Sequence, residues 1–128
     1  MINKRALGDQ IEQRCSEFLR QNGIKILERN FRNKTGEIDI IGFGDPYKKG
    51  TLANNGYLIF FEVKYRKNRT SGWAESAVNY SKQKIICGVS DYYRMINNID
   101  EGMPVIYDVL AVNENDIAWH KNAFGYMR

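Results

Sequence analysis

Two apolar segments of this chain carry charged residues in their interiors, and this pairing constrains the fold more than any other feature. Gly36–Ile41 (GEIDII) places Asp39 among isoleucines, and Leu58–Arg66 (LIFFEVKYR) places Glu62 and Lys64 after large apolar side chains. Side chains alternate between the faces of a strand, so Glu62 and Lys64 project from one face. Charges in a hydrophobic sheet are costly unless they are paired or bind a metal ion. The two segments therefore predict neighbouring strands that share a charged site.

Helical spacing of apolar residues predicts two long helices. The first spans 4–22 and ends at Asn22-Gly23, a common helix stop. Its apolar face is formed by Leu7, Ile11, Cys15 and Phe18. The second spans about 74–97, with one face formed by Ser81, Ile85, Val89, Tyr92 and Ile96.

Strand signals fill the segments between and after these helices. The predicted strands are 24–31, 37–43, 57–65 and 105–112, with a further short one at 117–120. The turn at 33–36 joins the first two as a hairpin, and the apolar run at 57–65 is typical of a central strand covered on both faces. We therefore expect an α/β fold of the αβββαβ type, with a mixed central sheet flanked by helices.

Length, charge and cysteine usage narrow the class of protein. The 128 residues suit one domain over 1–128, and the net charge of +4 mildly favours a polyanionic partner. Cys15 and Cys87 lie far apart without metal-ligand spacing, which favours a reduced compartment. Because the sequence has neither a signal-like segment nor a long apolar run, we expect a cytoplasmic protein without a membrane span.

The acids and the lysine suit metal-dependent phosphodiester chemistry. Mg²⁺ prefers hard oxygen ligands and keeps several waters, so Asp39 and Glu62 on neighbouring strands would suffice to hold it. Lys64 would orient the attacking water or stabilise charge at the phosphate, and the sequence does not choose between these roles. Glu12, on the edge of the first helix, is either a third acid at the metal or an ordinary surface glutamate.

The same residues also have plainer interpretations. Asp39 would serve as a hydrogen-bonded structural aspartate, and Glu62 with Lys64 as a solvated ladder of opposite charges. The apolar residues around Glu62 and Lys64, including Phe60 on the same face, argue against that ladder.

Basic residues gather near the hairpin and the end of the third strand. They would neutralise backbone phosphates independently of sequence, or simply form a solubilising rim. Tyr65 and Trp73 would stack on unpaired bases or pack in the rim of the core. The basic candidates are Arg29, Arg32, Lys34, Arg66, Lys67, Arg69 and, on the second helix, Lys82.

The order of these motifs resembles a known family over about residues 7–112. The motifs are Glu12, Arg29–Arg32 (RNFR), Gly36–Ile41, Phe60–Arg66 (FFEVKYR), Gly72 with Ala77-Val78, Lys82 and Tyr107–Val109 (YDV). Together they resemble the YraN-like family of the restriction-endonuclease-like PD-(D/E)XK superfamily, and the archaeal Holliday-junction resolvases are similar in the same region. Two departures are a longer loop at 44–56 and an Ile-Tyr-Asp sequence where the family often has Arg-Phe-Asp.

The resemblance implies an αβββαβ core and a role for each site residue. Asp39 and Glu62 would be metal ligands, Lys64 the catalytic lysine and Glu12 the accessory helix acid at the metal. Lys82 matches a position where nucleases of the superfamily carry a supporting Lys or Gln. The implied cofactor is Mg²⁺ or Mn²⁺.

We therefore expect an endonuclease that hydrolyses DNA, selective for branched or single-stranded structures. A homodimer would supply two sites for cutting two strands of a junction. One alternative is a nucleic-acid-binding module with a vestigial nuclease site. Another is a protein-interaction scaffold whose charges form surface salt bridges.

Overall fold

A computed structural model describes residues 3–48, 56–66 and 78–127 of the chain. In these residues the elements run in the order α1 (Lys4–Gln21), β1 (Lys25–Arg32), β2 (Glu37–Gly44), β3 (Tyr57–Tyr65), α2 (Tyr80–Ile96), β4 (Val105–Val112) and β5 (Ile117–Phe124). This order confirms the predicted succession of helices and strands. No helix in the described ranges combines the length and the apolar character needed to cross a membrane.

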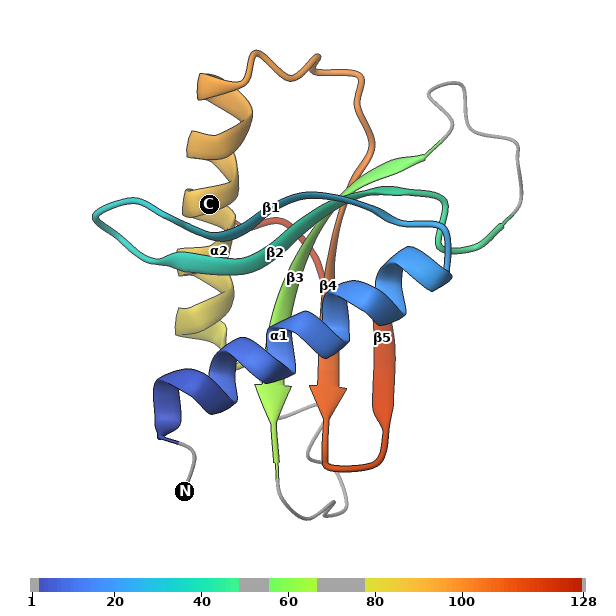
Figure 1. Ribbon diagram of the computed structural model, residues 1–128. Coiled ribbons are helices and arrows are strands. Elements are labelled where there is room, and N and C mark those ends of the chain that lie inside the picture. The colour runs from blue at the N-terminus through green and yellow to red at the C-terminus, as the bar shows by residue number, and fades with distance from the viewer. Residues whose placement is uncertain (1–2, 49–55, 67–77, 128) are drawn as a thin grey trace.

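The strands form one mixed sheet whose spatial order follows the chain, β1-β2-β3-β4-β5 (Figure 1). Only β3 and β4 pair in parallel, and the segment between them carries α2; the other neighbouring pairs are antiparallel. β3 is the middle strand, as its apolar sequence predicts. The sheet and its helices confirm the α/β class and are compatible with a restriction-endonuclease-like core.

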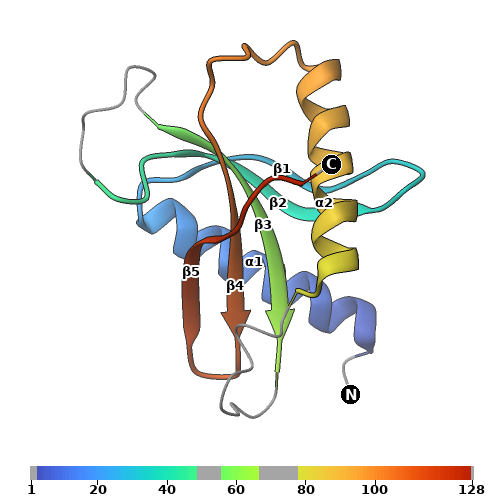
Figure 2. The same cartoon turned by 180° about the vertical axis from the view of Figure 1, so that it is seen from behind.

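The two helices cover opposite faces of this sheet, which Figures 1 and 2 show from the front and from behind. On the α1 side, Leu19, Ile40 and Phe61 belong to one buried cluster. On the α2 side, Phe60 and Val109 belong to the other. Burial on both faces explains why β3 reads as an almost continuous apolar run rather than an alternating one.

Helix α1 matches its prediction closely. Its N-cap is Asn3, whose side chain accepts a hydrogen bond from the Ala6 backbone N–H at 2.8 Å. Ile11, Cys15 and Leu19 are buried against the sheet, whereas Leu7 remains 38% exposed. The apolar face is therefore the predicted one except at its first turn.

Helix α2 corrects two predictions. It begins at Tyr80, because Asn79 caps it by accepting from the Lys82 backbone N–H at 2.9 Å; residues 78 and 79 are not helical, and 74–77 lie outside the described ranges. The buried face is also different from the predicted one. Ile86, Val89 and Tyr93 are buried, whereas most of the predicted face is exposed: Ser81, Ile85, Tyr92 and Ile96. Apolar residues on several sides of α2 made its periodicity ambiguous.

The last strand is longer than predicted, because β5 runs to Phe124. Its pairing with β4 shifts register between Tyr107 and Val109, and Asn122 in the same region has a φ of 53°. The second half of β5 was not predicted because Lys121-Asn122-Ala123 does not alternate between large apolar and polar side chains. The irregular pairing in the same region accounts for this loss of alternation. Most of the predicted loop at 44–56, together with Gly72, Trp73 and Ala77, lies outside the described residues.

Candidate active site

Asp39 lies where β2 separates from β3. Pairing between the two strands runs from Gly44 opposite Tyr57 to Ile40 opposite Phe61 and is not continued beyond that pair. One residue further on, the Asp39 carboxylate takes the place of a ladder partner: its Oδ2 accepts a hydrogen bond from the Val63 backbone N–H at 2.8 Å. We call the point where β2 and β3 separate the fork. The Asp39 side chain bridges the two strands there, and this bond fixes the position of its carboxylate.

The strand registers set the site residues in one row across the sheet. Continuing the β2–β3 register by one residue sets Asp39 opposite Glu62. On the outer side, the β1–β2 register sets Asn30 opposite Asp39. Beyond β3, Glu62 pairs with Val109, and Val109 pairs with His120. The sheet thereby brings together Asp39 and Glu62, which are far apart in sequence, as the motifs predict.

Glu62 is the buried carboxyl group of this row. It is 6% exposed. Burial raises its pKa to about 8, with further contributions from the charge of Asp39 and a side-chain hydrogen bond with it, while Lys82 and Lys64 act in the opposite direction. The protonated form of the Glu62 carboxyl is therefore favoured at neutral pH in the absence of a cation.

Two lysines supply positive charge to Glu62. The Nζ of Lys82, in the first turn of α2, lies 3.9 Å from Glu62 Oε2 and forms an ion pair with it. Lys64 follows Glu62 on the same face of β3, is half-buried, and lowers the pKa of Glu62 through its charge. Lys82 therefore faces the site from α2, and Lys64 is held beside the acids by its strand.

Glu12 approaches the same place from α1. A pocket of about 140 Å³ is lined by Gly8, Ile11, Glu12, Asp39, Val63 and Tyr65. The Glu12 carboxylate accepts a hydrogen bond from the Asn30 side chain at 2.8 Å and lies 3.6 Å from the Arg29 guanidinium. Burial raises the pKa of Glu12, the Asn30 bond lowers it, and Asp39 raises it. Glu12 is thus close enough to Asp39 for their charges to interact.

The donor set fits a divalent cation held mainly by two carboxylates. Glu62 Oε2 is buried and has no hydrogen-bond partner among the described residues, although buried polar atoms are usually satisfied. A cation between Asp39 and Glu62 would satisfy that atom and offset the Asp39 charge, which adds to burial in raising the Glu62 pKa. In the described ranges, no three His, Cys, Asp or Glu side chains are arranged to hold a metal ion together. Glu12 as a ligand stays a prediction.

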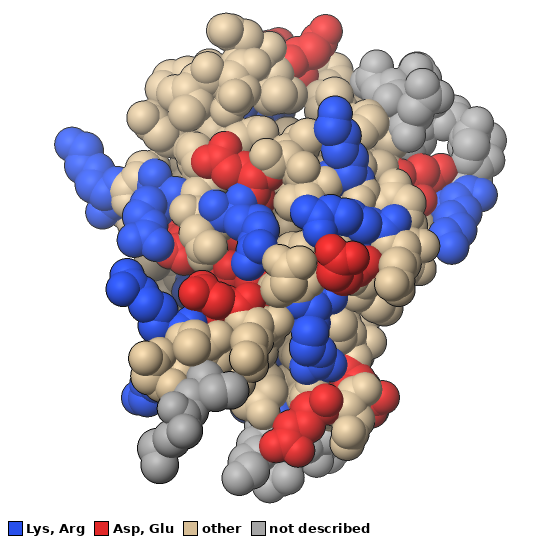
Figure 3. Space-filling view, viewed as in Figure 1, with Lys and Arg blue, Asp and Glu red and all other residues tan. Residues whose placement is uncertain are grey.

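The basic candidates for nucleic-acid binding differ in their solvent exposure and in whether an acidic side chain pairs with them. Arg29 is half-buried beside Glu12 and donates to Gln13 at 3.1 Å. Arg32 pairs with Glu37 at 2.9 Å on the exposed hairpin. Lys34 and Arg66 are exposed, while Lys67 and Arg69 lie outside the described residues. Figure 3 shows Lys and Arg interleaved with Asp and Glu on the α1 side of the molecule, rather than one continuous basic patch.

Sequence reasoning included two polar residues of this region, Asn30 and Asp108, in the family motifs but gave neither a role. Asn30 adopts a φ of 54° within β1 and directs its amide to Glu12. Asp108 is fully buried and accepts hydrogen bonds from Trp119 Nε1 at 2.8 Å and from the Asn122 backbone N–H at 2.7 Å. An asparagine inside a strand, and an acid inside the apolar run 105–112, were the available signals.

Comparison with known proteins finds relatives over nearly the whole chain. The model of the uncharacterised protein family UPF0102 matches residues 11–112. A UPF0102 protein of Lachnoclostridium phytofermentans is 37% identical over 123 residues, covering 96% of each chain. One from Shewanella loihica is 36% identical over 117 residues, covering 91% of this chain and 92% of the relative. One from Persephonella marina is 32% identical over 117 residues and covers 91% of both chains.

Proposed function

Because this chain belongs to the uncharacterised protein family UPF0102, the restriction-endonuclease-like YraN group, we propose that it is a Mg²⁺- or Mn²⁺-dependent endonuclease of DNA. The observation that carries the proposal is the row in which the fork of β2 and β3 sets Asp39 beside Glu62. A buried Glu62 and a half-buried Asp39, with Lys64 and Lys82 near Glu62, are the kinds of group that metal-dependent phosphodiester hydrolysis requires.

Each residue has a role that follows from its place. Asp39 and Glu62 hold the cation, which supplies charge neutralisation at the phosphate and activates water when it is bound. Lys64 lies on the same face as Glu62, where its ammonium stabilises the added negative charge of the transition state. Lys82 lowers the pKa of Glu62 through its charge and so favours the ionised form that binds the cation, and Asn30 orients Glu12 at the edge of the site.

The reaction balances as a simple hydrolysis. The oxygen of water forms a bond to phosphorus, one phosphorus–oxygen ester bond breaks, and the leaving oxygen takes up a proton. The proton lost by the water passes to solvent or to a carboxylate at the site. Lys64 and Lys82, whose charges lower the pKa of Glu62, are the cationic groups that would offset the negative charge of the phosphate.

Binding of DNA would depend on backbone phosphates. Lys34 and Arg66 are exposed, and Arg29 lies beside Glu12 near the fork. Such contacts are independent of sequence and weaken with salt. They support selectivity for DNA structure, such as branches or single strands, rather than for base sequence. A homodimer would place two such sites on one junction.

A non-cleaving nucleic-acid-binding module is the second candidate. The observation that favours it is that Glu12 is engaged by Asn30 and Arg29, and that no three-ligand set is present among the described residues. A pure binder, however, gains nothing from an acidic pair that repels phosphate.

A substrate panel separates the two candidates. Labelled four-way-junction, flap, single-stranded and duplex DNA are incubated with Mg²⁺ or Mn²⁺ and wild type, Glu62→Gln or the control Glu17→Gln. Glu17 is an exposed acid paired with Arg20 on α1. We expect the wild type and Glu17→Gln to cut branched or single-stranded DNA, and Glu62→Gln to be inactive. Salt-dependent binding that Glu62→Gln leaves unchanged, with no cutting by the wild type, would establish the binding module.

A further inference from the structure

The row of site residues continues past Glu62 to the other edge of the sheet. Glu62 pairs with Val109, and Val109 pairs with His120. Residues directly opposite each other on neighbouring strands project from the same face. His120 therefore lies on the α2 face, two strands from Glu62, at a distance of about 10 Å. A single nucleotide can span such a distance from its phosphate to its base.

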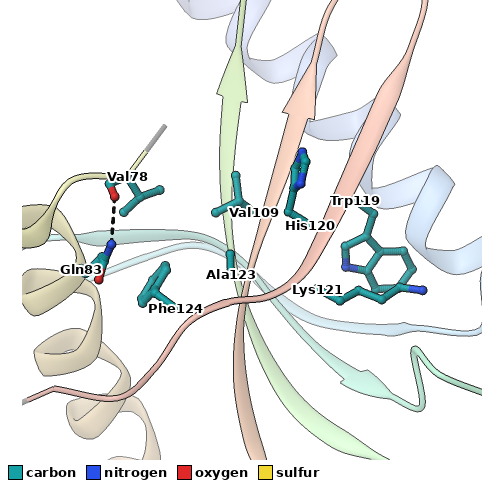
Figure 4. Close-up of a pocket in the computed structure, with 8 residues that line it drawn as sticks. All are labelled: Val78, Gln83, Val109, Trp119, His120, Lys121, Ala123 and Phe124. Carbon is teal, nitrogen blue, oxygen red and sulfur yellow. Dashed lines mark hydrogen bonds between the residues drawn. The ribbon is translucent and has the colours of Figure 1, made fainter. Parts of the chain in front are cut away.

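A pocket of about 390 Å³ opens at this end of the row. Val109 and the buried Val78 and Phe124 give it apolar walls, and Gln83 and His120 give it polar ones. Figure 4 shows Val78 and Gln83 on the α2 side of the pocket and His120 on the β5 side, with Val109 between them. The lining thus combines apolar side chains with placed polar groups, a combination that small-ligand sites use.

The pocket and the candidate active site share a wall. Gln83 lines the pocket, and its neighbour Lys82 forms the ion pair with Glu62. The Gln83 amide is held in place, since its Nε2 donates to the Val78 carbonyl at 2.9 Å. A group entering the pocket would thus lie beside the phosphate that the acids and lysines receive.

His120 carries a hydrogen-bonding atom for an occupant. Its Nε2 is buried and has no hydrogen-bond partner among the residues that the structure describes. In a neutral imidazole this nitrogen either donates or accepts, depending on the tautomer. Lys121 lies at the rim, with its Nζ 4.7 Å from the centre of the Trp119 ring, and adds positive charge there.

We propose that this pocket receives one unpaired nucleobase of the DNA strand whose phosphate lies at Glu62. The inference rests on the proposed function and adds the substrate feature that the enzyme recognises. A base enters with its flat faces against the apolar walls and its polar edge toward His120 and Gln83. A base inside a duplex must first leave its stack, which costs a few kcal/mol, so single-stranded or distorted sites are favoured.

The sole histidine of the chain makes the test direct. Its imidazole ring gives one set of proton NMR signals, which we would follow while adding an oligothymidylate or the same strand with abasic sites. Affinity is measured on the same strands with Ca²⁺ in place of Mg²⁺. The pocket is filled in Ala123→Phe, and Ala6→Phe makes the same change in the first turn of α1, on the other side of the sheet.

We expect the base-containing strand to shift the His120 signals and to bind about tenfold more tightly than the abasic strand. Ala123→Phe should remove this preference without weakening abasic binding, and Ala6→Phe should keep it. Equal affinities for the two strands, or an unchanged preference in Ala123→Phe, would overturn the pocket assignment while leaving the nuclease proposal intact. Wild type that neither binds nor cuts either strand would overturn both.

Discussion

The Asp39 carboxylate accepts a hydrogen bond from the Val63 backbone N–H at 2.8 Å, at the point where β2 and β3 separate. This bond gives Asp39 a structural role in addition to its proposed role as a cation ligand. The two roles are separable, because an amide oxygen can also accept from a backbone N–H but is a weaker cation ligand than a carboxylate.

Asp39→Asn should therefore fold like the wild type, while Asp39→Ala should lose about 1–2 kcal/mol because the Val63 N–H is left without its acceptor. Both variants should lose the stabilisation that Mn²⁺ gives the wild type. Denaturant unfolding with and without Mn²⁺ measures both effects. Full stabilisation of Asp39→Asn by Mn²⁺ would show that Asp39 does not bind the cation.

The raised pKa of Glu62 links folding to pH. Because its pKa in the folded protein is about 8 and its ordinary value is 4.5, the folded protein binds more protons than the unfolded chain between these values. The contribution of Glu62 to stability is thus fully present below pH 4.5 and is lost as the pH rises through 8. Without cation, Glu62→Gln should be more stable than wild type by about 1–3 kcal/mol at pH 9 and similar at pH 5. Parallel pH profiles of the two unfolding free energies would contradict this.

Lys82 should lower the pKa of the Glu62 carboxyl group. Its Nζ is 3.9 Å from Glu62 Oε2, and its charge lowers the Glu62 pKa. Lys82→Met should therefore raise the Glu62 pKa further, which a carbon-13 NMR titration of the glutamate carboxyls detects. Lys84→Met, an exposed lysine two positions along α2, is the matched control. A Glu62 titration that both variants leave unchanged would remove Lys82 from the site.

Asp108 should stabilise the folded protein through its buried hydrogen bonds. It is fully buried and accepts from the Trp119 indole and the Asn122 backbone, so Asp108→Ala leaves two donors unsatisfied. We expect a loss of about 2–4 kcal/mol in denaturant unfolding. Asp9→Ala, at an exposed position of α1, should change stability by less than about 0.5 kcal/mol. A loss for Asp108→Ala as small as this control would refute the structural role.

The helices and strands that could be predicted from sequence are those with one clear apolar pattern or one clear helix-capping signal. The apolar run of β3 predicted a central strand, and Asn22-Gly23 predicted the end of α1. Helix α2 was predicted less well, because Ile85 and Tyr92 suggest one face while Ile86 and Tyr93 are the residues that pack. Only tertiary contact decides between two apolar faces one residue apart.

Some features of the candidate site could likewise be predicted from sequence, and others could not. The residue types at 39, 62 and 64 predicted a charged site, since charges inside apolar strands require partners. The closure of the fork by Asp39 and the binding of Glu12 by Asn30 depend on register, which a single sequence does not give. His120 joins the row only because β5 pairs with β4 at Val109.

The measurement that tests the central claim most directly is the single-turnover rate of DNA cleavage with Mg²⁺ or Mn²⁺ for the wild type, Lys64→Ala and the control Lys84→Ala. Lys64 lies on the face of Glu62, so its removal should lower the rate at least about 100-fold at unchanged thermal stability, while Lys84→Ala cuts like the wild type. Wild type without cleavage of any junction, flap or single strand, or cleavage that Lys64→Ala leaves unchanged, would contradict the proposed active site.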